Sequence, residues 1–183
     1  MKSAVVLLSG GMDSAVCAAI AKSEGYNIYV IHVNYGQRTN KKEYNCAKDL
    51  SLFYNALDFK VINLDFLKEI GGSGLTDNSI ELPKTETEGI PLSYVPFRNS
   101  ILLSLATAWA EVVGAESIYY GANSIDFSGY PDCRPIFFKA FQELIDAGTK
   151  DETKIKLKTP LAYMSKSDIV KKGVELNVPF ERT

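Results

Sequence analysis

Residues 4–14 read Ala-Val-Val-Leu-Leu-Ser-Gly-Gly-Met-Asp-Ser, an apolar run that ends abruptly in a pair of glycines. The first five of these residues carry no polar side chain, which is typical of a strand buried on both faces of a parallel sheet. Helical spacing of apolar residues follows over 13–23, and Gly25 stands where a helix C-cap is favoured. The stretch therefore predicts a strand, a glycine turn and a helix, the first half of a βαβ unit.

The remainder of the chain continues this alternation of strand-like and helix-like segments. We expect one α/β domain spanning 1–183, with a doubly wound, mostly parallel sheet and helices on both faces. Residues 71–96 lack useful periodicity, which predicts a long functional or mobile loop. The expected strands are 4–8, 27–33, 56–64, 117–120 and 154–158, and the expected helices are 13–23, 40–51, 97–113, 136–147 and 165–177. In the helix over 97–113, the residues expected on one apolar face are Ile101, Leu102, Leu105, Trp109, Val112 and Val113.

Composition places the chain among ordinary globular proteins. It has 183 residues, of which 46% are hydrophobic and 23% charged, so a disulfide scaffold, a collagen or a disordered tail is excluded. The net charge of -2 argues against a nucleic-acid coat, and we expect no nucleic-acid partner. Three cysteines without a CxxC pair indicate a reducing compartment. No apolar stretch reaches the roughly 20 residues of a membrane span, so we expect a cytoplasmic protein without a membrane partner.

The turn over 8–14 has the chemistry of an anion cradle. Glycines let backbone N–H groups face a ligand, the helix N-terminus adds partial positive charge, and Ser9 and Ser14 add hydroxyl donors. A Walker A loop and a dinucleotide GxGxxG are both absent. Asp13 would oppose a phosphate unless a cation lay between them, which predicts Mg²⁺ bridging this carboxylate and substrate phosphates. The alternative is a glycine turn in which Asp13 and Ser14 only cap the helix.

Several segments of the sequence resemble one enzyme family. SGGMDS resembles the SGGxDS pyrophosphate loop of the PP-loop ATP-pyrophosphatase superfamily, which many ATP-using ligases share. Other segments are similar to those of the 7-cyano-7-deazaguanine synthase family, and among them SGYPDCR is far more specific than the loop. These segments are 32–38 (HVNYGQR), 95–99 (VPFRN), 126–135 (DFSGYPDCRP) and 159–161 (TPL) leading into Lys166. The resemblance covers essentially the whole chain in order.

The resemblance implies an adenine nucleotide alpha hydrolase-like fold and a reaction in queuosine precursor biosynthesis. In this reaction 7-carboxy-7-deazaguanine, ammonium and ATP give the nitrile 7-cyano-7-deazaguanine through adenylated intermediates, with release of AMP and pyrophosphate. Mg²⁺ is expected with the ATP, and free ammonium is the expected nitrogen source because the chain has no length for a glutaminase domain. The alternatives are another adenylating PP-loop enzyme and a nucleotide-binding module without catalysis. A homodimer is a further expectation from the family.

The resemblance also implies roles for individual residues. Asp13, Ser14 and Arg98 are the candidate catalytic residues, with Asp13 directed toward Mg²⁺. Arg98 is a candidate for the substrate carboxylate or the α-phosphate, because a guanidinium binds both in bidentate fashion. The expected nucleotide contacts are Leu8, Ser9, Gly10, Gly11, Met12, Asp13, Ser14, Ala15, Val16, Cys17, Ala18, Gln37 and Arg38. The expected substrate contacts are Arg98, Asn99, Asp126, Tyr130, Asp132 and Arg134. Asp126 or Asp132 would accept from the guanine-like ring, and Phe127 or Tyr130 would stack on it. The plainer alternatives are a simple ion pair of Arg98 and a simple turn at 130–132.

Zinc is the point at which the chain departs from the family pattern. The family carries a structural Zn²⁺ held by four cysteines beyond the last helix, after a segment like 178–183. None of the three cysteines here has zinc-ligand spacing, so we expect the zinc ligands in a missing C-terminal tail. Cys17 and Cys46 are expected to be small core residues. Cys133 is expected to be either a thiol of lowered pKa beside Arg134 or a buried structural thiol.

Overall fold

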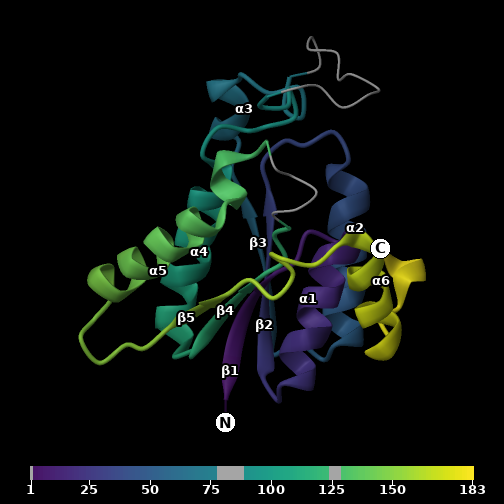
Figure 1. Ribbon diagram of the computed structural model, residues 1–183, viewed down its shortest axis with the longest axis vertical. Helices are drawn as coiled ribbons and strands as arrows, with labels where there is room; N and C mark the ends of the chain where they lie inside the picture. Colours follow the sequence, from purple (N-terminus) through teal and green to yellow (C-terminus); the bar gives the residue numbers. More distant parts are fainter. Residues whose placement is uncertain (1, 78–88, 124–128) are drawn as a thin grey trace.

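The computed structural model describes residues 2–77, 89–123 and 129–183, and a five-stranded sheet forms its centre (Figure 1). The strands lie in the order β3-β2-β1-β4-β5, and each pairs in parallel with its neighbours. The predicted doubly wound α/β fold is therefore confirmed. The strands are β1 (Ser3–Leu7), β2 (Asn27–Asn34), β3 (Asp58–Asn63), β4 (Ser117–Tyr120) and β5 (Lys156–Lys158).

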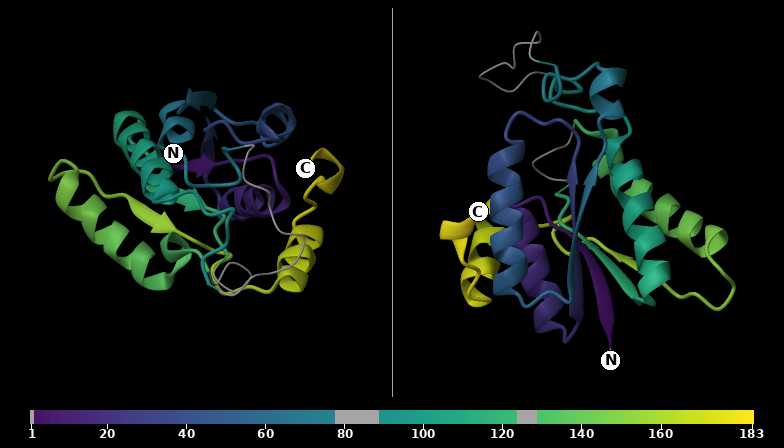
Figure 2. Two further views of the ribbon diagram at one scale, coloured as in Figure 1. Left: turned by 90° about the horizontal axis from the view of Figure 1, so that it is seen from above. Right: turned by 180° about the vertical axis from the view of Figure 1, so that it is seen from behind.

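Helices cover both faces of this sheet. α1, α2 and α6 pack on one face, whereas α4 and α5 pack on the other (Figure 2). The helices are α1 (Met12–Ser23), α2 (Asn40–Phe53), α3 (Phe66–Ile70), α4 (Arg98–Val113), α5 (Pro135–Gly148) and α6 (Lys166–Glu175), and single 3-10 turns lie at Pro131–Cys133 and Phe180–Arg182. In the part of the chain that the structure describes, no helix is long and apolar enough to cross a membrane.

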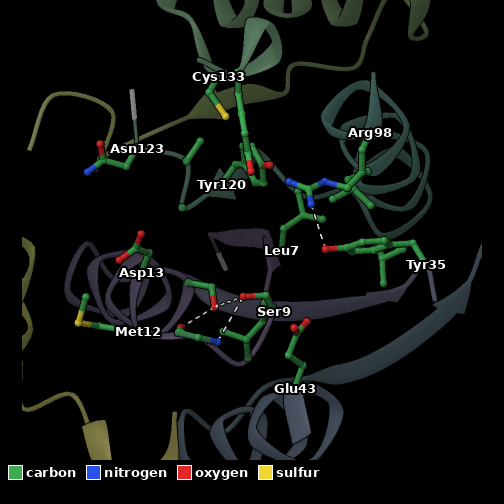
Figure 3. A pocket seen from close by; sticks show the side chains of 18 of the residues that line it. Leu7, Ser9, Met12, Asp13, Tyr35, Glu43, Arg98, Tyr120, Asn123 and Cys133 are labelled. Atoms are coloured by element: carbon green, nitrogen blue, oxygen red, sulfur yellow. Dashed lines mark hydrogen bonds between the residues drawn. The ribbon is translucent and has the colours of Figure 1, made fainter. Parts of the chain in front are cut away.

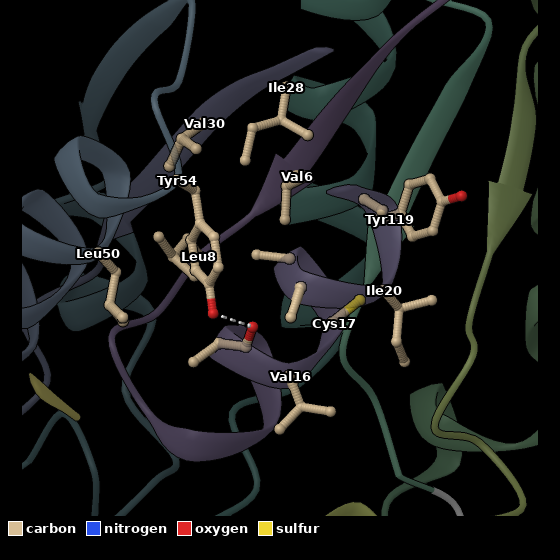
Figure 4. Packing of buried hydrophobic residues seen from close by; sticks show 14 of the residues in the cluster. Val6, Leu8, Val16, Cys17, Ile20, Ile28, Val30, Leu50, Tyr54 and Tyr119 are labelled. Carbon is tan, nitrogen blue, oxygen red and sulfur yellow. Dashed lines mark hydrogen bonds between the residues drawn. The ribbon is translucent and has the colours of Figure 1, made fainter. Parts of the chain in front are cut away.

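The central strand β1 connects the two halves of the core. Its successive side chains point to opposite faces, as strand geometry requires. Ala4, Val6 and the following Leu8 pack beneath α1, α2 and α6 (Figure 4), and Val5 and Leu7 pack beneath α4 and α5. All five are buried, which is what the unbroken apolar run predicts. On the first face the Tyr54 hydroxyl donates to the Ala15 carbonyl oxygen at 3.0 Å, which ties α2 to α1.

Two local features differ from the expectation. The short helix α3 was not predicted, because a single buried residue, Leu67, packs it against the core and five residues are too few to show periodicity. The assignment of Val112 to the buried face of α4 is wrong, since this side chain is 82% exposed. Leu103, Ala106 and Ala110 face the sheet instead. The small alanine side chains let α4 lie close to the strands, which rotates Val112 toward solvent.

The strand order reverses at β1, whose neighbours are β2 and β4. Doubly wound folds bind ligands at the carboxyl ends of the strands beside such a reversal. Two glycines permit close packing there. A Cβ at Gly10, where φ is +94°, would lie 2.4 Å from the Glu43 carbonyl oxygen of α2, and a Cβ at Gly121 would lie 3.1 Å from the Asp13 carbonyl oxygen of α1. The loop after β1 is therefore held tightly between α2 and the end of β4.

Candidate active site

A cavity of about 490 Å³ opens at the carboxyl ends of the central strands (Figure 3). Its volume lies within the range of small-molecule sites. The loop after β1 forms one wall, and Arg98, Tyr35 and Tyr120 form the facing wall. The predicted site residues that line it are Leu8, Ser9, Gly11, Met12, Asp13, Ser14, Arg98 and Tyr130. The other lining residues are Leu7, Ile31, Val33, Tyr35, Glu43, Leu75, Leu102, Tyr120, Gly121, Ala122, Asn123, Cys133 and Lys166.

The loop between β1 and α1 is shaped by its own hydrogen bonds. The Gly11 N–H donates to Ser9 Oγ at 3.3 Å, and the Ser9 and Ser14 hydroxyl oxygens lie 3.0 Å apart (Figure 3). Ser14 Oγ donates to the Gly11 carbonyl oxygen at 2.8 Å. In the described part of the chain no side chain caps α1, so Asp13 and Ser14 are not the simple caps of the alternative interpretation. The first N–H groups of α1 therefore keep their donor capacity for a ligand.

Asp13 places a negative charge in this anion-binding site, and the ammonium group of Lys166 compensates that charge. Lys166 Nζ lies 2.7 Å from Asp13 Oδ2. In the described residues, Asp13 Oδ1 is buried without a hydrogen-bond partner. An unpartnered carboxylate oxygen fits a magnesium ligand, because Mg²⁺ is usually held by one or two carboxylates together with substrate phosphates. Lys166 begins α6, whose N-cap residue Ser165 accepts from the Asp168 N–H at 3.2 Å.

Arg98 is the first residue of α4 and lines the wall that faces the loop. Its Nη1 donates to the Tyr35 hydroxyl at 2.9 Å, and its Nε and Nη2 each donate to Asn99 Oδ1 at 3.3 Å. Burial by itself would lower the pKa of Arg98, but the neighbouring Tyr35 and Tyr120 hold this pKa above its usual value. The guanidinium is therefore charged, and within the described residues no carboxylate forms an ion pair with it.

Asn99 and Asp132 were predicted to contact substrate, but both lie behind the cavity wall. Their side chains are buried and do not line the cavity. The Asn99 N–H donates to Asp132 Oδ2 at 3.0 Å, and Asn99 Nδ2 donates to the Asp132 carbonyl oxygen at 3.1 Å. The carboxylate thus satisfies an N–H of the first turn of α4, and burial raises the pKa of Asp132. Both residues thus lie next to Arg98 rather than at the cavity surface, and their direct contact with substrate stays a prediction.

Tyr130, a predicted substrate contact, lines the cavity. Its hydroxyl lies 2.6 Å from Ser93 Oγ, and its ring centroid lies 5.6 Å from that of Tyr94. Together with Tyr35 and Tyr120, Tyr130 gives the cavity three aromatic side chains. Such rings offer apolar faces on which a flat heterocycle can pack.

The other predicted contacts do not line the cavity. Gln37 is buried and donates to Glu43 Oε2 at 2.9 Å, whereas Arg38 donates to the Asp77 carbonyl oxygen at 3.1 Å. Only the first turn of α1 reaches the cavity, because the helix then runs into the core. The predicted residues outside the lining are Gly10, Ala15, Val16, Cys17, Ala18, Asn99, Gln37, Arg38, Asp132 and the exposed Arg134. Asp126 lies outside the described residues.

Some lining residues were missed by the prediction. Tyr35 follows β2 and Tyr120 ends β4, so the rule that ligands bind at carboxyl ends of strands could have found both. Glu43, on α2, accepts hydrogen bonds from Thr39 Oγ1 and Gln37 Nε2 and carries a carboxylate to the cavity. No local sequence signal marks Glu43, since it reaches the cavity only because α2 packs against the loop.

The described residues contain no group of three or more His, Cys, Asp and Glu that could hold a metal ion. These residues therefore do not fit the four-ligand zinc site of the family pattern. Cys17 and Cys133 are buried and Cys46 is partly buried. Burial raises the pKa of the Cys133 thiol to about 11. The buried structural thiol is thus the correct alternative for Cys133, and the lowered pKa is wrong.

Comparison with known sequences supplies the family. A family model described as queuosine biosynthesis protein QueC matches residues 3–183. The chain belongs to the QueC family. The 7-cyano-7-deazaguanine synthase of Methanospirillum hungatei is 50% identical over 182 residues, which cover 98% of this chain and 83% of that protein. The synthase of Halobacterium salinarum is 49% identical over 184 residues, which cover 100% of this chain and 80% of that protein. The predicted relationship and a role in queuosine precursor biosynthesis are confirmed.

Solved structures support the fold of the QueC family member described above. An NMN synthetase from Francisella tularensis matches with a TM-score of 0.57 at 18% sequence identity, covering 99% of this chain and 64% of that chain. At this identity the likeness concerns the fold alone. It confirms the expected adenine nucleotide alpha hydrolase-like architecture.

Proposed function

We propose that the chain converts 7-carboxy-7-deazaguanine and ammonium to 7-cyano-7-deazaguanine, using ATP to activate the carboxylate. One observation carries the proposal. The phosphate-type loop with Asp13 and the charged Arg98 face each other across a single cavity with aromatic walls. The loop suits the polyphosphate of a nucleoside triphosphate, and Arg98 suits a carboxylate. The relatives named 7-cyano-7-deazaguanine synthase support the same reaction.

The loop and the start of α1 would hold the polyphosphate of ATP. Backbone N–H groups after Gly11, the hydroxyls of Ser9 and Ser14 and the Lys166 ammonium supply the donors and positive charge. Asp13 would hold Mg²⁺ through its unpartnered oxygen. The metal, when bound, would neutralise charge on the phosphates as the α-phosphorus is attacked.

The opposite wall would hold the acid. Arg98 would bind its carboxylate, and the rings of Tyr35, Tyr120 and Tyr130 would pack on the deazapurine. Leu102 contributes apolar surface on the same side and helps to exclude water from the reacting groups. Positioning of this kind is the main catalytic contribution in phosphoryl and nucleotidyl transfer.

Two adenylations give the balanced reaction. A carboxylate oxygen attacks the α-phosphorus of ATP and pyrophosphate leaves. Ammonia then attacks the acyl carbon and loses a proton. AMP leaves and carries away the carboxylate oxygen that had attacked the α-phosphorus, so the primary amide forms. The amide oxygen then attacks a second ATP. Loss of the second AMP and of a nitrogen-bound proton leaves the nitrile. Each nitrile therefore corresponds to two AMP and two pyrophosphate.

The test is mass spectrometry of the acid after incubation with the protein, ATP, Mg²⁺ and ¹⁵N-ammonium. We expect a ¹⁵N-labelled nitrile together with AMP and pyrophosphate. An Asp13→Asn protein should release pyrophosphate about 100-fold more slowly. Full pyrophosphate release by Asp13→Asn would contradict the metal role. Bound nucleotide without any AMP or pyrophosphate would favour the binding module, and AMP formation that does not depend on the acid would favour another adenylating enzyme.

We further propose a homodimer on the basis of the family alone. Light scattering coupled to size-exclusion chromatography measures the molar mass directly. Twice the mass of one chain is expected, and the mass of one chain at micromolar concentration would contradict the proposal.

A further inference from the structure

The Arg98 guanidinium uses only part of its hydrogen-bonding capacity within the protein. An arginine side chain has five N–H donors in a fixed planar fork. Three of them are engaged, two by Asn99 Oδ1 and one by the Tyr35 hydroxyl. Within the described residues, one N–H on each terminal nitrogen has no protein acceptor. These two N–H groups remain for a ligand, and the planar fork of an arginine binds a planar oxyanion in bidentate fashion.

Asn99 is itself held in one orientation. Its side chain is fully buried, and its Nδ2 donates to the Asp132 carbonyl oxygen at 3.1 Å and to Cys133 Sγ at 3.3 Å. The Asp132 carbonyl oxygen can only accept, so the amide atom bonded to it is the nitrogen, and the amide oxygen faces Arg98. The Asn99 backbone N–H donates to Asp132 Oδ2 at 3.0 Å, which locks the same residue a second time.

We propose that Asn99 and Asp132 are positioning residues that fix the plane of the Arg98 guanidinium, so that its two remaining N–H groups bind the carboxylate of the substrate. This inference rests on the proposed function. Asn99 Oδ1 accepts from both Nε and Nη2, which prevents rotation of the guanidinium about its long axis. The ring of Tyr35, whose centroid lies 5.1 Å from the guanidinium carbon, limits tilting on the other side.

The position of Arg98 favours a carboxylate over a phosphate as its ligand. In Figure 3 Arg98 lies across the cavity from Ser9 and Asp13, whose loop has the donors for phosphate. The surroundings of Arg98 are the aromatic Tyr35 and Tyr120, which suit the ring that carries the carboxylate. Asn99 and Asp132 make no contact with the ligand in this arrangement, because neither lines the cavity.

The experiment is chemical rescue by guanidinium chloride at a concentration well below the denaturing range. Calorimetry measures binding of the acid, and steady-state kinetics measure the KM for the acid and the KM for ATP. Arg98→Ala should weaken acid binding about 100-fold, with little change in the KM for ATP. Added guanidinium should restore binding to Arg98→Ala, because Asn99 Oδ1 and the Tyr35 hydroxyl still form its seat. It should not restore binding to Arg98→Ala/Asn99→Leu, which keeps a similar volume but loses that acceptor.

A matched control is Arg98→Ala/Ser104→Ala. Ser104 Oγ donates to the Ser100 carbonyl oxygen on the same helix, and neither residue lines the cavity. Rescue in this control should equal that of Arg98→Ala alone. Equal rescue in the Asn99→Leu background would overturn the proposal, and so would an Arg98→Ala protein in which only the KM for ATP rises.

A second variant keeps the test decisive if Asn99→Leu does not fold, as thermal melting would show. Asp132→Ala, with Arg98 intact, should raise the KM for the acid at least about fivefold and leave the KM for ATP unchanged. Asp132→Asn can still accept from the Asn99 N–H, so its KM for the acid should return most of the way to the wild-type value. Unchanged acid binding in Asp132→Ala would overturn the proposal. A wild-type protein that binds the acid without making nitrile would contradict the proposed function, while the rescue pattern would still test the positioning role.

Discussion

At the scale of single residues, the two glycines of the loop have different physical roles. Gly10 has a φ of +94°, and an added Cβ would lie 2.4 Å from the Glu43 carbonyl oxygen, a contact that the backbone cannot relieve without moving. Gly11 has a φ of -86°, and among the described residues its Cβ would meet only Ser9 Oγ at 3.6 Å. We expect Gly10→Ala to lower the free energy of unfolding by about 2–4 kcal/mol, whereas Gly11→Ala should change it by less than about 0.5 kcal/mol.

Urea denaturation of the two variants measures this difference, and nucleotide titration adds a second readout. Gly11→Ala should fold normally yet bind ATP more weakly, because its methyl group stands where the backbone must approach the phosphates. Equal stability of the two variants would show that the packing of the loop against α2 is not as close as the structure has it.

The thiols provide a pH-dependent prediction. Burial raises the pKa of Cys133 to about 11 and raises that of Cys17 still further. Since the thiolate is the reactive form, alkylation of Cys133 by iodoacetamide in the folded protein should rise about tenfold per pH unit from pH 8 to pH 10 and stay slow at pH 8. Cys46, which is partly buried, should react first.

Peptide mass spectrometry after timed labelling locates the modified cysteines, and the urea-unfolded protein is the control in which all three should react alike. Labelling of Cys133 at pH 8 at the unfolded rate would contradict the buried neutral thiol. A lowered pKa would have given the opposite sign, with fast labelling that no longer depends on pH above neutrality.

The sequence predicts the residues of the loop much better than those of the facing wall. Ser9, Asp13 and Ser14 follow directly from a motif whose chemistry is local. Arg98 was also found, but Asn99 and Asp132 were placed in contact with substrate rather than behind Arg98. No local sequence feature distinguishes contact with substrate from support of Arg98, because both depend on how the segment before α5 packs on α4.

At the scale of elements, α6 depends on one glycine for its contact with α1. A Cβ at Gly173 would lie 2.2 Å from the Phe180 ring and 3.0 Å from Val16 Cγ2. Gly173→Ala should therefore lower the free energy of unfolding by about 1–3 kcal/mol through overpacking, although alanine is the better helix former. The matched control is Gly148→Ala at the end of α5, where no atom of the residues that the structure describes would lie within 4 Å of the added Cβ.

Thermal melting compares the two variants directly. Gly148→Ala should leave the Tm unchanged or raise it slightly, and Gly173→Ala should lower it by several degrees. Because Lys166 begins α6 and pairs with Asp13, Gly173→Ala should also change Mg²⁺-dependent nucleotide binding. Equal melting temperatures would show that α6 is not seated against α1 in solution as it is in the structure.

The elements were predictable where burial on both sides leaves a clear pattern. β1 was recognised because its whole run is apolar, and the parallel sheet followed from the alternation of strands and helices. The face of α4 was misjudged at Val112, since alanines carry little hydrophobic signal although they mark the side of closest packing. The five residues of α3 were too few to produce a period at all.

At the scale of the whole molecule, the fold brings three distant segments to one cavity. The loop after β1, the start of α4 and the start of α6 meet at the carboxyl ends of β1 and β4. The order of the strands, which reverses at β1, explains why the cavity lies there. Residues 13, 98 and 166 are far apart in the chain, yet their charges line one cavity, as the proposed adenylation requires.

The most direct test of adenylation follows both oxygens of the acid. The protein would be incubated with 7-carboxy-7-deazaguanine labelled with ¹⁸O in both carboxylate positions, together with ATP, Mg²⁺ and ammonium, and AMP, pyrophosphate and nitrile would be analysed by mass spectrometry. Two adenylations predict one ¹⁸O in every AMP formed, two AMP for each nitrile, and no label in pyrophosphate. Label in pyrophosphate or inorganic phosphate, or unlabelled AMP beside labelled water, would contradict attack of the acid and amide oxygens on the α-phosphorus.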